Sequence, residues 1–424
     1  MNILGMIFMT IFLDLIGFGL IIPIQPFYVQ SFSISPSYIT LLSAVYSGMQ
    51  LLASPILGRW SDQVGRKPVI LVSISMMVVG YACFAQAETW WGLVLARALS
   101  GLGAGNLGVA QAMVSDLSDE SNRTRNMGLI GVAFGLGFIL GPALGGLLGQ
   151  YTLTLPIYVA MCLSILNGLL VYYFLPSDLS AYSAANHDTA QHKNHTDGPI
   201  EKPSPPEASN WLYLPLVRSI LASTFVFACM FTLMEQCIGF YIEKNWILSG
   251  DPHVSLDTIS IEQAKQAAKL TAYFLISVGL TAIWVQGFLI KSVSKKYANQ
   301  TLILAGLSFV SLALFLIPQV TSDYSFYYLL LVAVIMSHGT GLLHPSRSSL
   351  LSARTPKHLQ GRVFGWYHSC SAFGRMIGPS IAGVLFEWKA SSPFYLASIS
   401  LLGLALYLAW QFKRDQRMMH NSAI

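Results

Sequence analysis

Four charged side chains lie inside long apolar stretches of the sequence, namely Asp14, Arg97, Glu235 and Arg375. If these stretches cross a bilayer, each charge costs at least about 2.5 kcal/mol at mid-membrane, so it needs a partner or a function. A carboxyl group placed there can carry a proton, because burial favours its neutral form and a nearby arginine favours its charged form. These four residues are therefore the first candidates for chemistry.

The elements that must position them are long apolar helices. The chain has 424 residues, of which 54% are hydrophobic and only 10% charged, whereas soluble domains carry about 25% charged residues. Apolar runs near 20 residues recur, each long enough to cross about 30 Å of hydrocarbon. We predict an all-α membrane protein with twelve transmembrane helices, at 3–28, 38–57, 69–87, 91–115, 127–149, 154–175, 214–241, 266–290, 300–318, 326–349, 363–386 and 393–412.

The distribution of basic residues predicts the orientation of these spans. If the N-terminus lies in the cytoplasm, eighteen Lys and Arg residues fall on the inner side and four on the outer side. Inner loops carry the excess of positive charge in membrane proteins. We therefore expect both termini to be cytoplasmic, and the net charge of +5 reflects topology and gives no sign of a nucleic-acid partner. The first span lacks a basic leader and a cleavage site, so it is expected to be a retained helix.

The spans divide into two halves of six around a polar segment. Residues 177–213 are rich in Ser, Asn, Pro and His and predict a cytoplasmic linker. It separates two predicted six-helix bundles, residues 1–176 and 214–424. The motif "GLGFILGPALGG" of the fifth span returns as "AFGRMIGPSIAG" in the eleventh, which indicates pseudo-symmetric parallel repeats. At a constant offset the pairs are Gly137 and Gly374, Gly141 and Gly378, Pro142 and Pro379, and Gly146 and Gly383.

The fifth span contains a glycine stripe. Gly137, Gly141, Gly145 and Gly149 are four apart and lie on one helix face. Small residues at this spacing let helix backbones approach closely in lipid, and Pro142 can bend the helix. The spacing fits a tight static contact and a rocking interface equally well.

Several motifs resemble those of a known transporter family. The turn "GRWSDQVGRKP" (58–68) resembles the loop signature of the major facilitator superfamily. The glycine–proline pattern of the fifth span is similar to that of the superfamily's proton-driven exporters, and "RALSGLGAG" (97–105) to its span-four signature. The first span, with Asp14 followed by glycines and prolines, is similar to that of the tetracycline-efflux branch. The residues that match the loop signature are Gly58, Asp62, Gly65, Arg66 and Lys67.

The loop suggests a cytoplasmic gate. Asp62 can accept hydrogen bonds from an adjacent helix N-terminus or pair with an arginine, and so hold the cytoplasmic side shut. The alternative is a solvated turn that obeys the positive-inside rule. The second half keeps Gly287 in the corresponding loop but has Lys291 where Asp62 stands, so a charge latch is expected on one side only.

Asp14 and Arg375, two of the charged residues inside the predicted spans, are expected to have different roles. Asp14 and Arg375 lie about 16 Å and about 18 Å into their spans, at similar depth. Arg375 replaces the repeat residue Phe138, and we expect it to face a central cavity and meet an anionic substrate group or a carboxylate. A fixed, helix-orienting ion pair is the alternative. Asp14 is either a proton carrier or a helix-packing hydrogen-bond partner near Gly17.

Four further polar residues complete the candidate set. Glu235 and Gln236 are expected to line the cavity and bind substrate or a proton; the alternative is that Glu235 extends to the outer rim of the membrane. The superfamily resemblance implies a proton-coupling role for Arg97, which needs a partner from span one, five or seven. His338 either titrates in the cavity or is a polar packing residue.

These observations predict a transporter rather than an enzyme. The sequence has no phosphate-binding glycine loop, metal-ligand spacing or nucleophile elbow, so no cofactor or metal is expected. The energy must come from an ion gradient or from the substrate's own gradient. We expect a monomeric proton-coupled antiporter of a bacterial inner membrane, exporting a small, partly hydrophobic molecule by alternating access. A tetracycline-like drug and a metabolite such as a siderophore fit equally well. A proton-coupled importer of the same fold and a non-transporting sensor or scaffold are the alternatives.

Overall fold

The structure of the protein is a computed structural model that describes residues 3–30, 32, 34–117, 133, 136–137, 140–176, 215–248, 260–355 and 360–421. All regular structure within these residues is helical. The predicted linker, 177–213, lies outside them, and so does Phe138, so the domain boundaries remain predictions.

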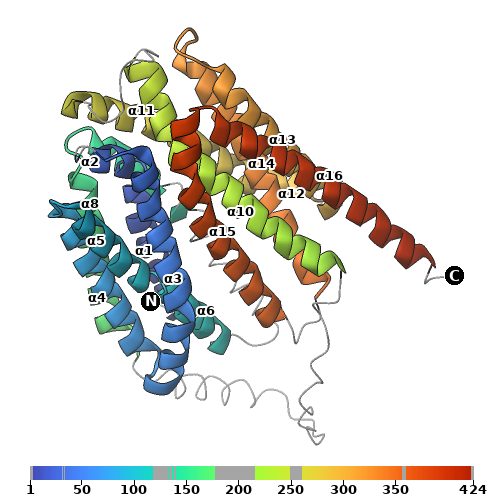
Figure 1. Cartoon of the computed structure of the whole chain (residues 1–424). Helices are drawn as coiled ribbons and strands as arrows, with labels where there is room; N and C mark the ends of the chain where they lie inside the picture. The colour runs from blue at the N-terminus through green and yellow to red at the C-terminus, as the bar shows by residue number, and fades with distance from the viewer. Residues whose placement is uncertain are drawn as a thin grey trace, which may run out of the picture.

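Helices of the first half pack together on one side of the molecule (Figure 1). They are α1 (Ile3–Ile21), α2 (Gln25–Gln30), α3 (Pro36–Val64), α4 (Arg66–Ala85), α5 (Trp90–Gly103), α6 (Asn106–Asp116), the short helix Leu140–Gly149 and α8 (Leu155–Phe174).

Helices of the second half form a matching bundle on the other side. They are α10 (Pro215–Ile242), the π-helical η2 (Glu243–Ile247), α11 (Ile261–Trp284), the π-helical η3 (Val285–Leu289), α12 (Ile290–Val293), α13 (Asn299–Leu316), the 3₁₀ turn η4 (Ile317–Gln319), α14 (Phe326–Ala353), α15 (Gln360–Trp388) and α16 (Ser392–Asn421).

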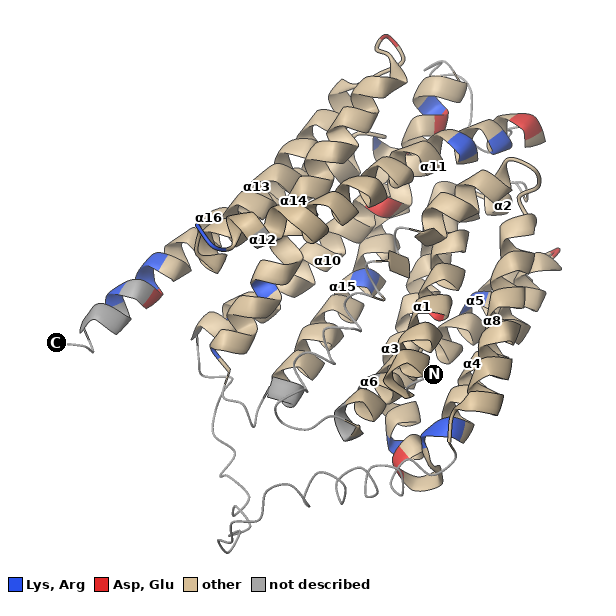
Figure 2. Cartoon of the chain, turned by 180° about the vertical axis from the view of Figure 1, so that it is seen from behind, with Lys and Arg blue, Asp and Glu red and all other residues tan. Residues whose placement is uncertain are grey.

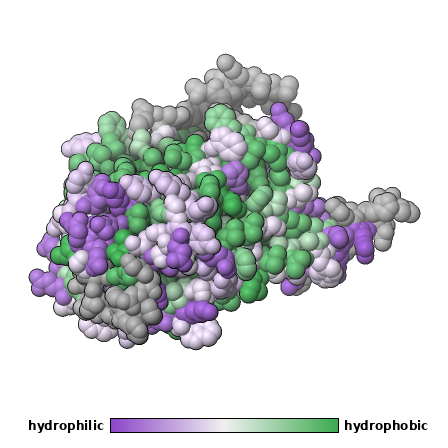
Figure 3. Space-filling view, turned by 90° about the horizontal axis from the view of Figure 1, so that it is seen from above, coloured by the Kyte–Doolittle hydropathy of each residue, from purple (hydrophilic) through white to green (hydrophobic). Residues whose placement is uncertain are grey.

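The helices agree with the predicted spans. Among the described residues, ten helices are long and apolar enough to cross a membrane. Of the two remaining predicted spans, the eleventh corresponds to α15. The fifth, 127–149, lies partly outside the described residues, and its last part is the helix Leu140–Gly149. The outer surface is apolar, as lipid contact requires: Ile56 is 65% exposed and Leu406 67% exposed. Charged residues are sparse along the middle of the helices and more frequent toward their ends (Figure 2), and hydrophobic side chains cover much of the flank in Figure 3.

Two predicted spans are not continuous helices. The first divides into α1 and α2, because Pro23 and Pro26 interrupt the backbone hydrogen bonds; Pro26 is tolerated in the first turn of α2. The fourth divides into α5 and α6 at Ala104 and Gly105, within its glycine-rich signature. Each break places a polar residue, Gln25 or Asn106, at the start of the following helix.

The bundles meet at one end of the molecule. We call the end with the α3–α4 turn and the C-terminus of α16 the terminal face. The end at which the bundles meet, where α2 and the start of α11 lie, is across the molecule from it and is called the opposite face. The bundles approach each other at the opposite face and spread toward the terminal face (Figure 1). At the opposite face the Ser37 backbone N–H donates to Glu387 Oε1 at 2.9 Å, and the Gly383 N–H donates to Thr40 Oγ1 at 3.2 Å.

The glycine stripe packs within its own bundle. A Cβ added at Gly141 would lie 2.7 Å from Gly19 Cα, and one at Gly137 would lie 2.5 Å from Leu15 Cβ, both on α1. A Cβ at Gly145 would overlap the Leu20 carbonyl, and one at Gly149 would lie 2.7 Å from Ile24 Cγ2. The stripe therefore permits close approach to α1 and the chain segment after it.

The neighbouring Gly146 has a different role. It faces Ala272 of α11, in the other bundle. The repeat reproduces this division: Gly374 and Gly378 pack against α10 of their own bundle, and Gly383 faces Ser37 of α3 in the other. Gly146 and Gly383 thus make close contacts between the bundles, while the stripe makes its closest contacts within one bundle.

Gly145→Ala should destabilise the protein, because its methyl group would overlap the Leu20 carbonyl and overpacking costs about 1–3 kcal/mol. Gly403→Ala is the matched control, since a Cβ there meets no atom within 4 Å and alanine favours a helix. Thermal unfolding of the purified protein should show a lower Tm for Gly145→Ala only. Equal Tm values for the two variants would contradict the close contact.

Candidate functional site

Two pockets are lined by residues of both bundles. Their empty volumes, counted to their open mouths, are about 550 Å³ and about 500 Å³. Both are lined by Phe18 of α1, Tyr46 and Ser47 of α3, and Arg375 of α15. The pockets are thus neighbouring parts of one region, which we call the central cavity.

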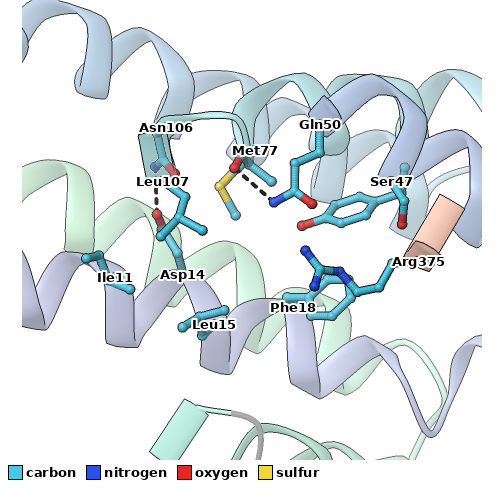
Figure 4. A pocket seen from close by; sticks show the side chains of 12 residues that line it. Ile11, Asp14, Leu15, Phe18, Ser47, Gln50, Met77, Asn106, Leu107 and Arg375 are labelled. Carbon is cyan, nitrogen blue, oxygen red and sulfur yellow. Dashed lines mark hydrogen bonds between the residues drawn. The ribbon is translucent and has the colours of Figure 1, made fainter. Parts of the chain in front are cut away.

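Asp14 lines the first pocket and is held by two amides. Asn106 Nδ2 donates to Asp14 Oδ2 at 2.7 Å (Figure 4), and Asn167 Nδ2 donates to Oδ1 at 2.8 Å. These residues come from α1, α6 and α8, and within the described ranges no Lys or Arg lies within 4.0 Å of the carboxylate. Asp14 therefore makes helix-packing hydrogen bonds and also faces the cavity. Its partners lie on α6 and α8.

Arg97 is nearly inaccessible, with 4% of its surface exposed, and its partners are also neutral. Its guanidinium donates to Gln25 Oε1 and lies 4.5 Å from the ring centroid of Phe84 and 5.9 Å from that of Tyr46. Aromatic faces and an amide oxygen can stabilise a buried cation without a carboxylate. Gln25 belongs to the predicted first span, one of the three expected to supply a partner.

A hydrogen-bond chain runs from Arg97 across the bundle interface. Gln25 Nε2 donates to Ser43 Oγ at 2.8 Å, and Ser43 Oγ donates to Gln236 Oε1, also at 2.8 Å. The chain therefore connects α5, α2 and α3 of the first bundle to α10 of the second. It ends beside Glu235, so the buried arginine and the cavity carboxyl belong to one connected polar region.

Glu235 and Arg375 line the second pocket together with Arg97 and Gln236. Arg375 Nη1 donates to Ser371 Oγ at 2.8 Å. No carboxylate of the described residues lies within 4.0 Å of its guanidinium. Because Arg375 also lines the first pocket (Figure 4), one cation faces both carboxyl groups of the cavity without a fixed ion pair to either.

His338 lies apart from this site. It is not among the residues lining either pocket. Its Nδ1 lies 2.9 Å from the Val334 carbonyl oxygen of its own helix, and its ring centroid is 5.5 Å from that of Trp284. The geometry corresponds to the packing alternative, because the side chain lies against the end of α11 rather than in the cavity.

The candidate gate loop forms a local ion pair. Asp62 Oδ1 lies 2.5 Å from Arg66 Nη1, and that nitrogen also donates to Ser61 Oγ at 2.6 Å. Gly65 has φ of 94°, a conformation that favours glycine and explains its place in the motif. Lys67 lies over the Tyr172 ring, 5.6 Å from its centroid. Asp62 thus pairs with an arginine, one of the two expected partners, while a gating role remains a prediction.

Sequence reasoning missed the neutral partners of the site. They are Gln25, Ser43, Asn106 and Asn167. Each is an isolated amide or hydroxyl within an apolar stretch, and that was the available signal, because a buried polar group needs a hydrogen-bond partner. The signal identifies such residues but not which charge each one contacts.

Asn167→Ala should destabilise the protein, because Asn167 is fully buried and donates both to Asp14 and to the Thr10 carbonyl at 3.2 Å. Leaving a buried acceptor without its donor costs about 1–3 kcal/mol. Asn299→Ala, which removes an exposed hydrogen bond to Ser349, is the control. Thermal unfolding should show the lower Tm for Asn167→Ala, and an unchanged Tm would contradict the importance of this bond.

Comparisons with known proteins agree with this architecture. The family model of the Major Facilitator Superfamily matches residues 7–250 and 244–423. The chain is similar to tetracycline resistance protein, class D, of Salmonella ordonez, with 29% identity over 93% of this chain and 92% of the relative. It is also similar to multidrug resistance protein 2 of Bacillus subtilis (strain 168), with 26% identity over 97% and 96% of the two chains.

Solved structures share the fold. The human organic anion transporter MFSD10 (TETRAN) superposes with a TM-score of 0.64 and 22% identity, covering 96% of this chain and 98% of the other. A peptide transporter POT gives a TM-score of 0.72 at 16% identity, covering 98% and 95%. These likenesses confirm the predicted fold class. Because the family model matches both halves, the chain belongs to the Major Facilitator Superfamily.

Proposed function

We propose that the protein is a proton-coupled antiporter that exports a small, partly hydrophobic organic molecule by alternating access. The observation that carries this proposal is the central cavity, where Asp14, Glu235 and Arg375 lie between two bundles that meet at the opposite face. The names of its relatives, which refer to resistance to tetracycline and to multiple drugs, support efflux of a drug. Phe18 and Tyr46 supply apolar and aromatic surface for such a molecule.

Competition for the carboxylates can couple substrate to protons. A cationic group of the substrate binds an ionised carboxylate much more tightly than a protonated one, so substrate and proton compete at Asp14 or Glu235. Arg375 faces both pockets and can neutralise whichever carboxylate is ionised and empty. This competition is the condition for exchange of substrate against protons.

The hydrogen bonds of Asp14 give its protonation a structural consequence. Both of its oxygens accept from amide NH₂ groups. A proton on the carboxyl group weakens these bonds, because a neutral carboxyl oxygen is a poorer acceptor than a carboxylate oxygen. Asn167 is held by its second bond to Thr10, whereas Asn106 begins α6 beside the break in the fourth span. Protonation is therefore expected to act first on Asn106 and α6.

The energy source and location complete the proposal. A membrane potential supplies about 2.3 kcal/mol per charge per 100 mV, so a proton gradient is sufficient and no cofactor or enzymatic step is required. We place the protein in a bacterial inner membrane with both termini cytoplasmic, working as a monomer. In that orientation the present conformation, which is closed at the opposite face, is the inward-facing state of the transport cycle.

Addition of an exported compound to acid-loaded inside-out vesicles should release protons, which an internal pH dye reports. We expect release with one of a panel of tetracyclines, quinolones, dyes and metal chelators. It should be lost in Asp14→Asn or Glu235→Gln and retained in Glu387→Gln, whose carboxylate is exposed outside the cavity. Release that survives loss of both cavity carboxyl groups would refute the mechanism. If no compound of the panel triggers proton release although folded protein is present, import or a scaffold role would be favoured.

Ser43→Ala should weaken coupling, because it removes the hydroxyl that joins Gln25 to Gln236 across the bundles. Ser47→Ala is the control, since Ser47 lies one turn further along α3 and lines both pockets without being part of the chain. We expect substrate-driven proton release to fall severalfold in Ser43→Ala while substrate affinity stays within about twofold. Equal rates in the two serine variants would exclude a role for the chain.

A further inference from the structure

One acidic residue at the bundle interface, Glu243, lies outside the central cavity and has no role in the mechanism above. Glu243 is the first residue of η2, at the end of α10, and it is fully buried, with 0% of its surface exposed. Its Oε1 accepts a hydrogen bond from Gln30 Nε2 at 3.0 Å. Gln30 is the last residue of α2, so this bond joins the two bundles at the opposite face. π-Helical turns such as η2 are frequent at functional sites.

Among the residues that the structure describes, Glu243 has no ion-pair partner. No described Lys or Arg nitrogen lies within 4.0 Å of it, and its Oε2 has no hydrogen-bond partner among the residues that the structure describes. Lys244, the next residue, is partly exposed and makes no ion pair within the described ranges.

The elements packed against Glu243 carry few titratable groups, and these are occupied elsewhere. On α11, Lys265 lies 4.0 Å from Glu262, and Lys269 lies 5.9 Å from the ring centroid of Tyr273. On α10, Tyr241 donates to the Val320 carbonyl at 3.1 Å, and on α2, Tyr28 donates to the Phe84 carbonyl at 3.0 Å. The remaining acid of α10, Glu235, lies in the central cavity two turns away.

An ionised Glu243 would be costly in this conformation. A buried carboxylate with one neutral donor loses hydration that it does not recover. A proton removes this cost, because a carboxylic acid can both accept from and donate to a carboxamide. Separation of α2 from η2 would instead expose the group to water, where its ionised form is stable.

We propose that Glu243 is a second proton-binding site, occupied whenever the opposite face is closed and emptied to the aqueous phase of that face when it opens. The proposal rests on the proposed function in one respect: it adds a proton requirement to the closing step of alternating access. It assigns no substrate contact to Glu243. A proton from the opposite side is needed to close this face, independently of the protons exchanged at Asp14 and Glu235.

The same face contains a natural control. Glu387 also joins the bundles, since its Oε1 accepts from the Ser37 N–H at 2.9 Å, but its side chain is exposed. Water can solvate its ionised form in the closed conformation, so closing does not require its protonation. The two glutamates share their interface and differ in burial, and only the buried one should respond to pH.

The test measures conformation rather than transport. The five native cysteines are replaced by alanine, and nitroxides are attached at Tyr38→Cys and Ile261→Cys. Both positions are exposed at the opposite face, on different bundles. In lipid nanodiscs the distance between the two nitroxides reports the opening of this face. Distance distributions are recorded from pH 5 to pH 9 for the parent, Glu243→Gln and Glu387→Gln. Glutamine resembles the protonated acid and keeps the acceptor for Gln30, so Glu243→Gln should fold.

We expect the ratio of open to closed parent molecules to rise with pH, approaching tenfold per pH unit, because opening releases one proton. Glu243→Gln should remove most of this slope and favour the closed state, and Glu387→Gln should retain it. A slope unchanged in Glu243→Gln, or a parent without pH dependence, would overturn the proposal. Since no substrate or gradient is used, this result is independent of whether substrate-driven proton release is observed.

Discussion

The structure depends on keeping charged side chains in a low-dielectric interior with neutral partners. Asp14 is held by two asparagine amides, and Arg97 by a glutamine oxygen and two aromatic faces. A carboxylate–guanidinium pair in this interior would be a strong fixed bond. Amides and rings stabilise each charge less and leave it able to change partner or protonation state. A carrier that must release what it binds needs this weaker arrangement.

The interruptions of the helices serve this arrangement. Pro23 and Pro26 end α1 and begin α2, which places Gln25 beside Arg97. The glycine-rich stretch that ends α5 begins α6 at Asn106, beside Asp14. A continuous helix would place each amide elsewhere around its axis. The breaks in these two spans therefore position the polar partners of the site, and backbone groups freed in them are adjacent to a polar cavity rather than to lipid.

The repeats use glycine for two kinds of contact. Glycines of the stripe hold the helix Leu140–Gly149 against α1 within one bundle, and Gly146 and Gly383 form smooth contacts between bundles. The contacts between bundles gather at the opposite face, near the Gln30–Glu243 and Ser37–Glu387 hydrogen bonds. Small residues limit interlocking of side chains, so this end can separate without extensive repacking, while the bundles themselves stay rigid.

Much of this protein follows from its sequence alone. Apolar length requires membrane helices, the repeated glycine–proline motif relates the fifth span to the eleventh, and the cost of burying charge identifies Asp14, Arg97, Glu235 and Arg375. These features are determined by local composition and by the bilayer, so spacing along the chain is enough to recognise them.

The tertiary structure decided what each charge contacts. It brought Asn167 to Asp14 and Ser43 to Gln236, and it placed His338 against Trp284 outside the cavity. It also buried Glu243 between the bundles, although the sequence places this residue at the end of a span, where a glutamate is normally solvated. These outcomes depend on helix rotation and on the packing of segments far apart in the chain. Hydrophobic periodicity determines neither, because every face of a membrane helix can be apolar.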